Sequence, residues 1–246
     1  FGLGFKSVFL VSNLPKVLSG DLCFKIVGGL WPMQCDEREQ LNGLLHAHEP
    51  ENAPPGTIIV LPEVGNADLV LERFRSLCSL LCVTGQGIQK ISIINGDETP
   101  EHFSWKPKRL SMDDRIEYGA LSCCEEANLP KYALKLRMPE GALILGMDEQ
   151  GPSPFSKEVP TIWSLAPTRE YTSLGLILNA RNLPLDVGRS RIGNVTEEMI
   201  TEFADELTRR FSSIAEYVCR DWEEARHEWQ LDGGLSAYDF WLNFFE

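Results

Sequence analysis

Three features that would each mark a class of protein are missing from this sequence. No apolar stretch approaches the ~20 residues that a membrane-spanning helix needs, so we expect neither a transmembrane segment nor a membrane partner. Positive charge is scarce. The 23 Lys and Arg against 36 Asp and Glu give a formal net charge of −13, which argues against nucleic acid as the main partner because phosphates bind to basic surfaces. The seven cysteines show no metal-ligand spacing, so we expect reduced, structural cysteines in a cytoplasmic protein.

An initiator methionine is also missing, and the chain opens on a glycine-rich segment. Gly2 and Gly4 flank Leu3, and Phe5 and Lys6 begin an apolar run of helical spacing. Glycines let the backbone come close to an anion, and a helix start directs free N–H groups and the positive end of its dipole to the same place. The pattern favours a phosphate-binding loop, although a Gly-x-Gly pair is also found in ordinary turns. Because the rest of a nucleotide pocket would precede Phe1, we expect a fragment of a longer protein.

Two motifs in the first part of the chain resemble one superfamily. The run FGLGFKSVFLVS at residues 1–12 resembles the last glycine box of Bergerat-fold ATPases, which include gyrase, the ninety-kilodalton heat-shock chaperone, histidine kinases and mismatch-repair ATPases. Gly56 and Thr57, before the apolar residues 58–61, are similar to the Gly-Thr pair that begins a central strand behind the nucleotide in that superfamily. Lys6 matches the sacsin-like branch, because the chaperone usually has an aromatic residue there.

A third motif resembles the chaperone branch. The run LPLDVGR at residues 183–189 is similar to the catalytic loop of the chaperone's middle domain, and Arg189 falls on the arginine that reaches the γ-phosphate. A guanidinium presents a planar fork of donors that matches phosphate oxygens, so the chemistry is consistent. Arg191 is a second, weaker candidate. Gly193 stands where the family's loop has a glutamine, which removes one polar contact to the nucleotide.

The resemblance implies ATP as the cofactor. Gly2, Leu3, Gly4 and Phe5 would offer backbone amides to the phosphates, and Lys6 would either touch phosphate or be solvated. Thr57 would lie near the adenine wall, and Arg189 would sense the γ-phosphate as the catalytic residue. The family's Mg²⁺ ligand, its water-positioning glutamate and its adenine-binding segment would all lie upstream of Phe1. We therefore expect the isolated chain neither to bind ATP tightly nor to hydrolyse it, whereas its parent would do both.

The expected fold class is α+β, in two domains. Residues 1–98 would form the C-terminal half of a Bergerat ATP-binding sandwich, and residues 99–246 an α/β, transducer-like middle domain. In the first part the patterns predict, in order, a hairpin over 16–27, a polar loop over 36–55, a strand from 57, a helix from Asn66 and a strand over 88–94. In the second part, alternation over 132–138 predicts a strand with one buried face, between antiparallel neighbours near 114–122 and 142–147.

A long helix is predicted after the arginine motif, with Asn194 as its N-cap. We expect its apolar stripe to pack against the sheet. The stripe consists of Ile200, Phe203, Leu207, Phe211, Ile214 and Val218. The aromatic segment 238–245 is either a core face or a docking surface.

Three functions remain open. The favoured one is a chaperone-type ATPase that acts on a protein client or on partner domains of the same parent. The second is a sacsin-like scaffold module with weak or no ATPase activity. The third is a protein-interaction domain whose glycine loop is only a turn. Nucleotide binding separates the first two from the third.

Overall fold

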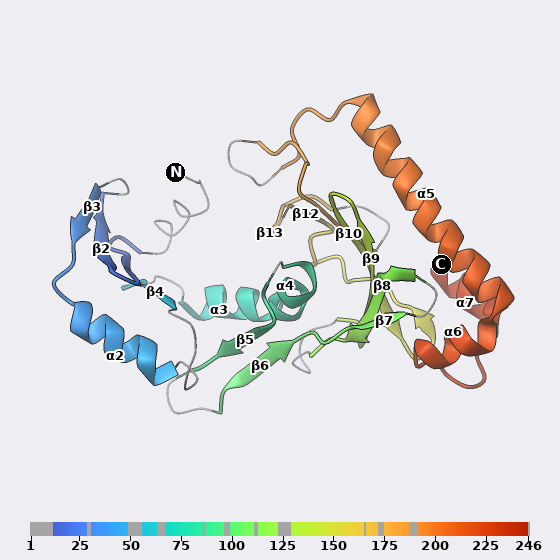
Figure 1. The fold of residues 1–246 in the computed structure, drawn as a ribbon, viewed down its shortest axis with the longest axis horizontal. Coiled ribbons are helices and arrows are strands. Elements are labelled where there is room, and N and C mark those ends of the chain that lie inside the picture. The colour runs from blue at the N-terminus through green and yellow to red at the C-terminus, as the bar shows by residue number, and fades with distance from the viewer. Residues whose placement is uncertain are drawn as a thin grey trace. The chain divides into compact units, whose positions relative to one another are not determined.

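The computed structural model describes residues 12–28, 31–48, 56–62, 67–85, 87–95, 99–110, 113–122, 129–164, 166–171, 175–186 and 191–245. Helices and strands are mixed along the chain, as the α+β prediction requires (Figure 1). The chain divides into two compact units, residues 1–72 and residues 73–246. This division by contacts does not test the domain boundary expected between residues 98 and 99, which stays a prediction. No helix in the described part of the chain is long and apolar enough to cross a membrane.

The first unit contains a four-stranded antiparallel sheet in the order β3-β2-β1-β4. Its strands are β1 (Lys16–Ser19), β2 (Leu22–Val27), β3 (Trp31–Gln34) and β4 (Thr57–Val60). The predicted hairpin over 16–27 is confirmed as β1–β2, with Gly20 at φ +52° in its turn, where a residue without a side chain is favoured. The predicted strand from Thr57 is confirmed as β4, which pairs with β1.

Helix α2 (Arg38–His48) corrects the polar loop predicted over 36–55. Leu41 is only 2% exposed and packs with Leu18 and Cys35, and the half-buried Leu45 lies one turn further on the same side. Burial of Leu41 in this cluster holds the helix against the sheet, even where its other positions are polar. The prolines that suggested a loop come only after the helix has ended.

The helix predicted from Asn66 is two helices in the structure. Helix α3 (Ala67–Arg75) spans the boundary between the units and buries none of its residues. Helix α4 (Cys78–Thr84) belongs to the second unit and is almost wholly buried. Arg75, the last residue of α3, belongs to the second unit and makes a forked pair with Glu101 of the same unit, with nitrogen–oxygen distances of 2.6–2.9 Å.

The second unit is built on a large sheet in the order β13-β12-β14-β10-β9-β8-β7, with β11 paired to β10. All its pairs are antiparallel except β12–β14. The strands are β7 (Lys108–Leu110), β8 (Asp113–Ala120), β9 (Tyr132–Met138), β10 (Gly141–Asp148), β11 (Gly151–Pro152), β12 (Ile162–Ser164), β13 (Ala166–Pro167) and β14 (Ile177–Ala180). The predicted strand over 132–138 and its two antiparallel neighbours are confirmed, but the prediction of a single buried face is wrong, because Ala133 is buried on the other face.

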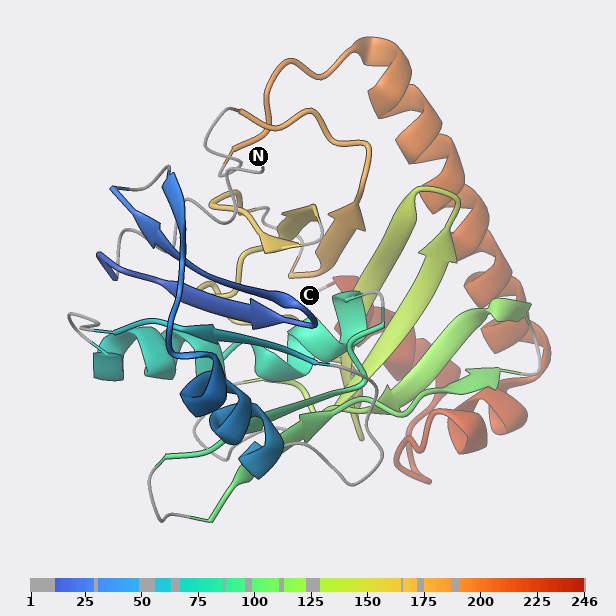
Figure 2. The same ribbon diagram turned by 60° about the vertical axis from the view of Figure 1, so that its left-hand side comes forward.

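Three helices cover one face of this sheet: α5 (Glu197–Arg220), α6 (Trp222–Glu228) and α7 (Ala237–Phe245). Figure 2 shows them, orange to red, along one side of the green strands. Leu134 and Leu136 point to this face, where Val218, Trp229 and Phe240 meet them. The aromatic segment at the end of the chain therefore contributes Phe240 to the core, while Tyr238 is 74% exposed.

The opposite face is covered by α4 and by the hairpin of β5 (Lys90–Ile93) and β6 (Glu101–Ser104). Ala133 and Ile144 point to this face and pack with Leu80 and Trp163. Adjacent residues of one strand thus enter different cores, as the period of two requires. The second unit buries both faces of its sheet.

Candidate functional site

The expected phosphate-binding residues and the expected catalytic arginine lie outside the described residues. These are Gly2, Leu3, Gly4, Phe5, Lys6 and Arg189. The apolar run of helical spacing that begins at Phe5 and Lys6 also lies outside them, up to residue 11. The glycine loop and the arginine contact therefore remain predictions from the sequence.

Thr57 is the expected cofactor residue that the structure places. It is the exposed first residue of β4, directly opposite Ser19 of β1. The two hydroxyl oxygens are 2.7 Å apart, so one hydroxyl donates to the other. Thr57 thus presents its hydroxyl at the edge of the strand pair, where it can still accept or donate a further hydrogen bond.

The arginine loop, residues 183–193, has a closed stem. Leu185 and Ile192 form an antiparallel bridge, and the Asp186 N–H donates to the Arg191 carbonyl at 2.9 Å. The backbone N–H of Arg191 donates a hydrogen bond to the Asp186 carboxylate at 3.3 Å. On the side of the bridge away from residues 187–190, the Gly193 N–H donates to the Pro184 carbonyl at 2.6 Å. Two sides of the loop are therefore tied together on either side of residues 187–190.

The base of this loop is tied to the sheet. The Arg181 N–H donates to the carbonyl of Glu140, in the β9–β10 turn, at 2.9 Å. A Cβ at Gly141 would lie 1.9 Å from the Asn179 carbonyl oxygen, so only glycine allows β10 to approach β14 this closely. Asn179 is buried and donates to the Thr84 carbonyl at the end of α4, at 3.1 Å. The loop therefore leaves a well-anchored strand.

On its other side the loop leads into α5, whose N-cap corrects a prediction. Thr196, not Asn194, is the cap, and its hydroxyl accepts from the Met199 N–H at 3.3 Å. Glu197 and Glu198 in the first turn complement the helix dipole. The connection from β14 to α5 is thus held at both of its ends.

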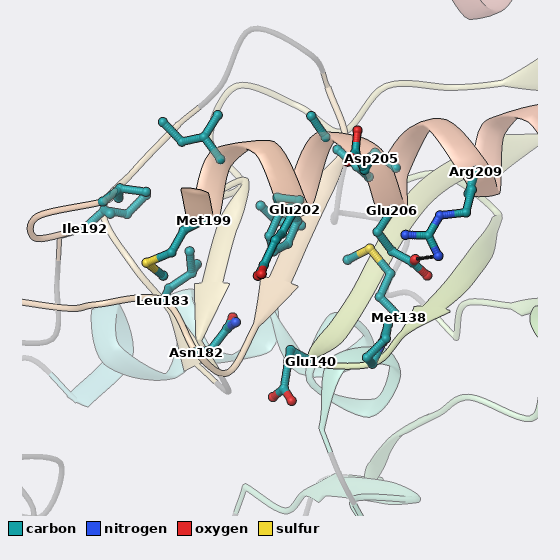
Figure 3. A pocket seen from close by; sticks show the side chains of 17 residues that line it. Met138, Glu140, Asn182, Leu183, Ile192, Met199, Glu202, Asp205, Glu206 and Arg209 are labelled. Atoms are coloured by element: carbon teal, nitrogen blue, oxygen red, sulfur yellow. Dashed lines mark ion pairs between the residues drawn. The ribbon is translucent and has the colours of Figure 1, made fainter. Parts of the chain in front are cut away.

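A groove of about 680 Å³ opens beside the loop, between the first three turns of α5 on one side and the β9–β10 turn with the end of β14 on the other. Figure 3 shows α5 along one side, with Met138, Glu140, Asn182 and Leu183 on the other and Ile192 at one end. The lining is mainly apolar, and it includes Leu178, Val195, Met199, Ile200, Phe203 and Leu207. We call this feature the α5 groove.

Charge at the α5 groove is mostly negative. Glu206 holds Arg209 at 2.7 Å and the buried Arg210 at 2.6 Å. Glu140, Glu202 and Asp205 also line the groove and are exposed. Among the described residues no ion pair joins these three to a cation. The groove therefore combines an apolar wall with carboxylates that no cation pairs within the part of the chain that the structure describes.

A separate ionic cluster lies on the α4 face of the sheet. Glu117 is 4% exposed and accepts two hydrogen bonds from Arg137, at 2.6 and 3.0 Å. Lys135 donates to the Val83 carbonyl at 2.7 Å and lies over the Trp105 ring, 5.2 Å from its centroid. Burial lowers the pKa of Lys135, with Arg137 adding to the effect and Glu117 opposing it. These groups satisfy one another, so the cluster fits a structural role.

Neither the groove nor the ionic cluster was predicted from the sequence. Alternation along β9 correctly placed Lys135 and Arg137 on one face, but α4 covers Lys135 on that face, while the Arg137 side chain stays half exposed. For the groove, the sequence carried one usable observation, the apolar stripe of α5, which starts several residues before the sheet can cover it. Among the described residues no cluster of three His, Cys, Asp or Glu side chains could hold a metal ion.

Comparisons of the chain with protein-family models, with curated proteins and with solved structures found no match. The interpretation of the site accordingly depends on the motifs and on the geometry described above.

Proposed function

We propose that this chain is part of an ATP-binding, chaperone-like ATPase with a Bergerat-type nucleotide domain. In this proposal the glycine segment 2–6 binds the phosphates and Arg189 approaches the γ-phosphate from the arginine loop. ATP hydrolysis then drives domain closure on a protein client. Mg²⁺ would be held by residues upstream of Phe1, where it would neutralise phosphate charge.

The observation that carries the proposal is the stem of the arginine loop. Arg189 belongs to residues 187–190, which connect two chain segments joined by the Leu185–Ile192 bridge. The described stem follows β14 on one side and leads into α5 on the other, so it fixes where the segment that carries Arg189 begins and ends. Fixed ends favour the positioning that stabilisation of charge in phosphoryl transfer requires.

Mg-ATP binding and hydrolysis by the parent protein, including its residues upstream of Phe1, test the proposal. Gly4→Val is expected to abolish binding, because a side chain would exclude the phosphate from the backbone. Arg189→Ala is expected to keep binding and lower kcat by about a thousandfold or more. Arg181→Ala is the matched control, since Arg181 is an exposed arginine eight residues away with its backbone bonded to the sheet.

A second candidate, a protein-interaction domain that does not bind nucleotide, is favoured by the α5 groove. It predicts that no form of the protein binds ATP. Retained binding with no measurable turnover in the parent would favour the sacsin-like scaffold. Turnover by the isolated 246-residue chain that is sensitive to Arg189→Ala would contradict our expectation that the upstream residues are required.

A further inference from the structure

Helix α5 carries an apolar stripe that extends past the core it serves. In its C-terminal half, Ile214, Tyr217 and Val218 are buried against the sheet. In its first turns, Ile200 is 58% exposed and Phe203 is only half-buried. Both belong to one helical face, because they are three residues apart. The N-terminal part of this face therefore lies along the α5 groove instead of in the core.

The groove continues the core without a break. Leu178 of β14 and Leu207 of α5 pack against the helix-side core and also line the groove. Beyond them the apolar surface runs on to Met199 and Ile200 on α5 and to Leu183 on the arginine loop. Met199, like Met138 on the opposite side, is a side chain that adapts to different partners. This apolar surface resembles part of a core that no helix or strand among the described residues covers.

We propose that the α5 groove binds an amphipathic helix with a basic polar face, contributed by a partner protein. This inference does not depend on ATP or on Arg189, and it assigns to this chain a binding surface of its own. Positions 199, 200, 203 and 207 form the ridge that an apolar helix face packs against. The groove is bounded by a helix on one side and by a strand turn and loop on the other, so it is elongated along α5 (Figure 3).

The carboxylates around the groove favour a partner with a positively charged surface. Glu140, Glu202 and Asp205 are uncompensated among the described residues, and the side chain of Arg209 is already engaged by Glu206. Figure 3 shows Glu202 extending from α5 toward the side that holds Asn182 and Glu140. A partner with Lys or Arg beside its apolar stripe would pair with these carboxylates, whereas an acidic partner would be repelled. Binding should therefore weaken as salt rises.

The test is a titration of the 246-residue chain into a fluorescein-labelled peptide of about 18 residues, with Leu on one helical face and Lys on the other. Fluorescence anisotropy measures binding. A peptide with the same residues in an order that destroys the apolar face is the first control, and a peptide with Glu in place of Lys is the second. We expect micromolar or tighter binding of the first peptide alone, with a transition to helix in its circular dichroism.

Two pairs of variants locate the binding. Ile200→Asp should weaken binding by about tenfold or more, since it places a charge in the apolar wall. Thr201→Asp adds the same charge at the next, exposed position of α5, which does not line the groove, and should leave binding unchanged. Glu202→Lys should weaken binding and reduce its salt dependence, whereas Glu216→Lys, exposed near the other end of α5, should do neither.

Three outcomes would overturn the proposal. Equal binding of the ordered and the scrambled peptide would show that charge alone attracts them. Binding that survives Ile200→Asp in a variant whose circular dichroism matches the parent would place the peptide elsewhere. Concentration-dependent dimerisation that Ile200→Asp abolishes, with no peptide binding, would show that a second copy of the chain occupies the groove.

Discussion

Few described side chains cover the sheet of the first unit, whereas the sheet of the second unit is covered on both faces. In the first unit, Leu18, Cys35 and Leu41 form the buried cluster, with one described helix packed on the strands. In the second, buried side chains from three helices fill one face, and α4 with the β5–β6 hairpin fills the other. A sheet is stable only when its apolar faces are covered, so the two units should differ in stability.

Exposed apolar side chains show the same difference. The edge strand β3 of the first unit is exposed along its whole length, with Trp31 at 73% and Met33 at 50%. Leu22 and Ile59 on its other strands are 64% and 47% exposed. In the second unit, by contrast, the central strand β10 is buried from Ala142 to Met147. We infer that the first unit opens at lower free energy than the second, as poorly covered regions of proteins do.

The largest expected effect comes from the same substitution made in both units. Leu136→Ala removes a side chain that is 0% exposed between β8, β10 and the helices, and Leu41→Ala removes one that is 2% exposed on α2. We expect a loss of ~4 kcal/mol for Leu136→Ala and ~2 kcal/mol for Leu41→Ala, because the surroundings of Leu41 can collapse or hydrate more easily.

Urea unfolding followed by circular dichroism measures both free energies, and hydrogen exchange locates them. Leu41→Ala should raise exchange only in the first unit, whereas Leu136→Ala should raise it throughout residues 73–246. Equal losses for the two variants, with the same exchange pattern, would contradict the difference in core coverage.

The next largest loss of stability is expected when a buried hydroxyl of the second unit is removed. Tyr118 is 2% exposed, and its hydroxyl donates to the Trp229 carbonyl beneath α6. Tyr118→Phe should cost ~1–2 kcal/mol at neutral pH, since the hydrogen bond is lost and a buried carbonyl is left unsatisfied. Chemical denaturation at neutral pH gives this value.

The same residue predicts an alkaline limit to stability. Burial raises the pKa of Tyr118 above its ordinary value, with Tyr132 and Asp148 adding to the effect. Above about pH 10 the unfolded chain loses this proton while the folded chain keeps it, so stability falls as pH rises. Below that pH both states hold the proton and the dependence vanishes. The difference between the parent and Tyr118→Phe, measured from about pH 8 to 11, should therefore shrink above about pH 10; a constant difference would contradict the assignment.

A smaller effect distinguishes two N-caps for α5. Thr196 accepts from the Met199 N–H, whereas the sequence pattern pointed to Asn194. Thr196→Ala should destabilise the second unit by ~1 kcal/mol, and Asn194→Ala should have almost no effect. Thermal unfolding compares them, and hydrogen exchange at 197–203 should increase in the first variant only. The reverse order of effects would restore the cap predicted from the sequence.

Much of the second unit's sheet could be predicted because its signals are local. In β9 the alternation of Leu134 and Leu136 with Ala133 and Lys135 specifies both faces, and the flanking strands are close in sequence. The parallel pairing of β12 with β14 could not be predicted in this way, because no short pattern specifies which distant strands pair. Helix α2 was missed because its burial depends on Leu41 and Leu45 alone within a polar segment.

For the candidate site the sequence suggested motifs, which stay predictions where their residues lie outside the described ones, and it did not indicate the shape of the α5 groove. The arginine motif was evident in the sequence, yet the bridge between Leu185 and Ile192 depends on backbone geometry that residue types do not specify. The stripe of α5 was read as core along its whole length, because a periodic pattern says which face is apolar and not how far the sheet extends beneath it. Ile200 shows where that reading was wrong.

The smallest expected effect on stability falls in the first unit and bears on its proposed role. Thr57 is an exposed edge residue, so Thr57→Val should change the free energy of unfolding by less than about 0.5 kcal/mol. If Thr57 contacts the nucleotide, the same variant in the parent protein should lower ATP affinity severalfold. Ser19→Ala removes the hydroxyl that lies 2.7 Å from Thr57 but keeps Thr57 itself, so it should leave ATP affinity unchanged.

Isothermal titration of ATP into the parent protein carrying each variant separates the two cases. An equal loss in both would mean that the hydroxyl pair positions the strands and that Thr57 does not touch ATP. A loss of ATP affinity in Thr57→Val alone would show that the exposed edge of the first unit's sheet takes part in nucleotide binding.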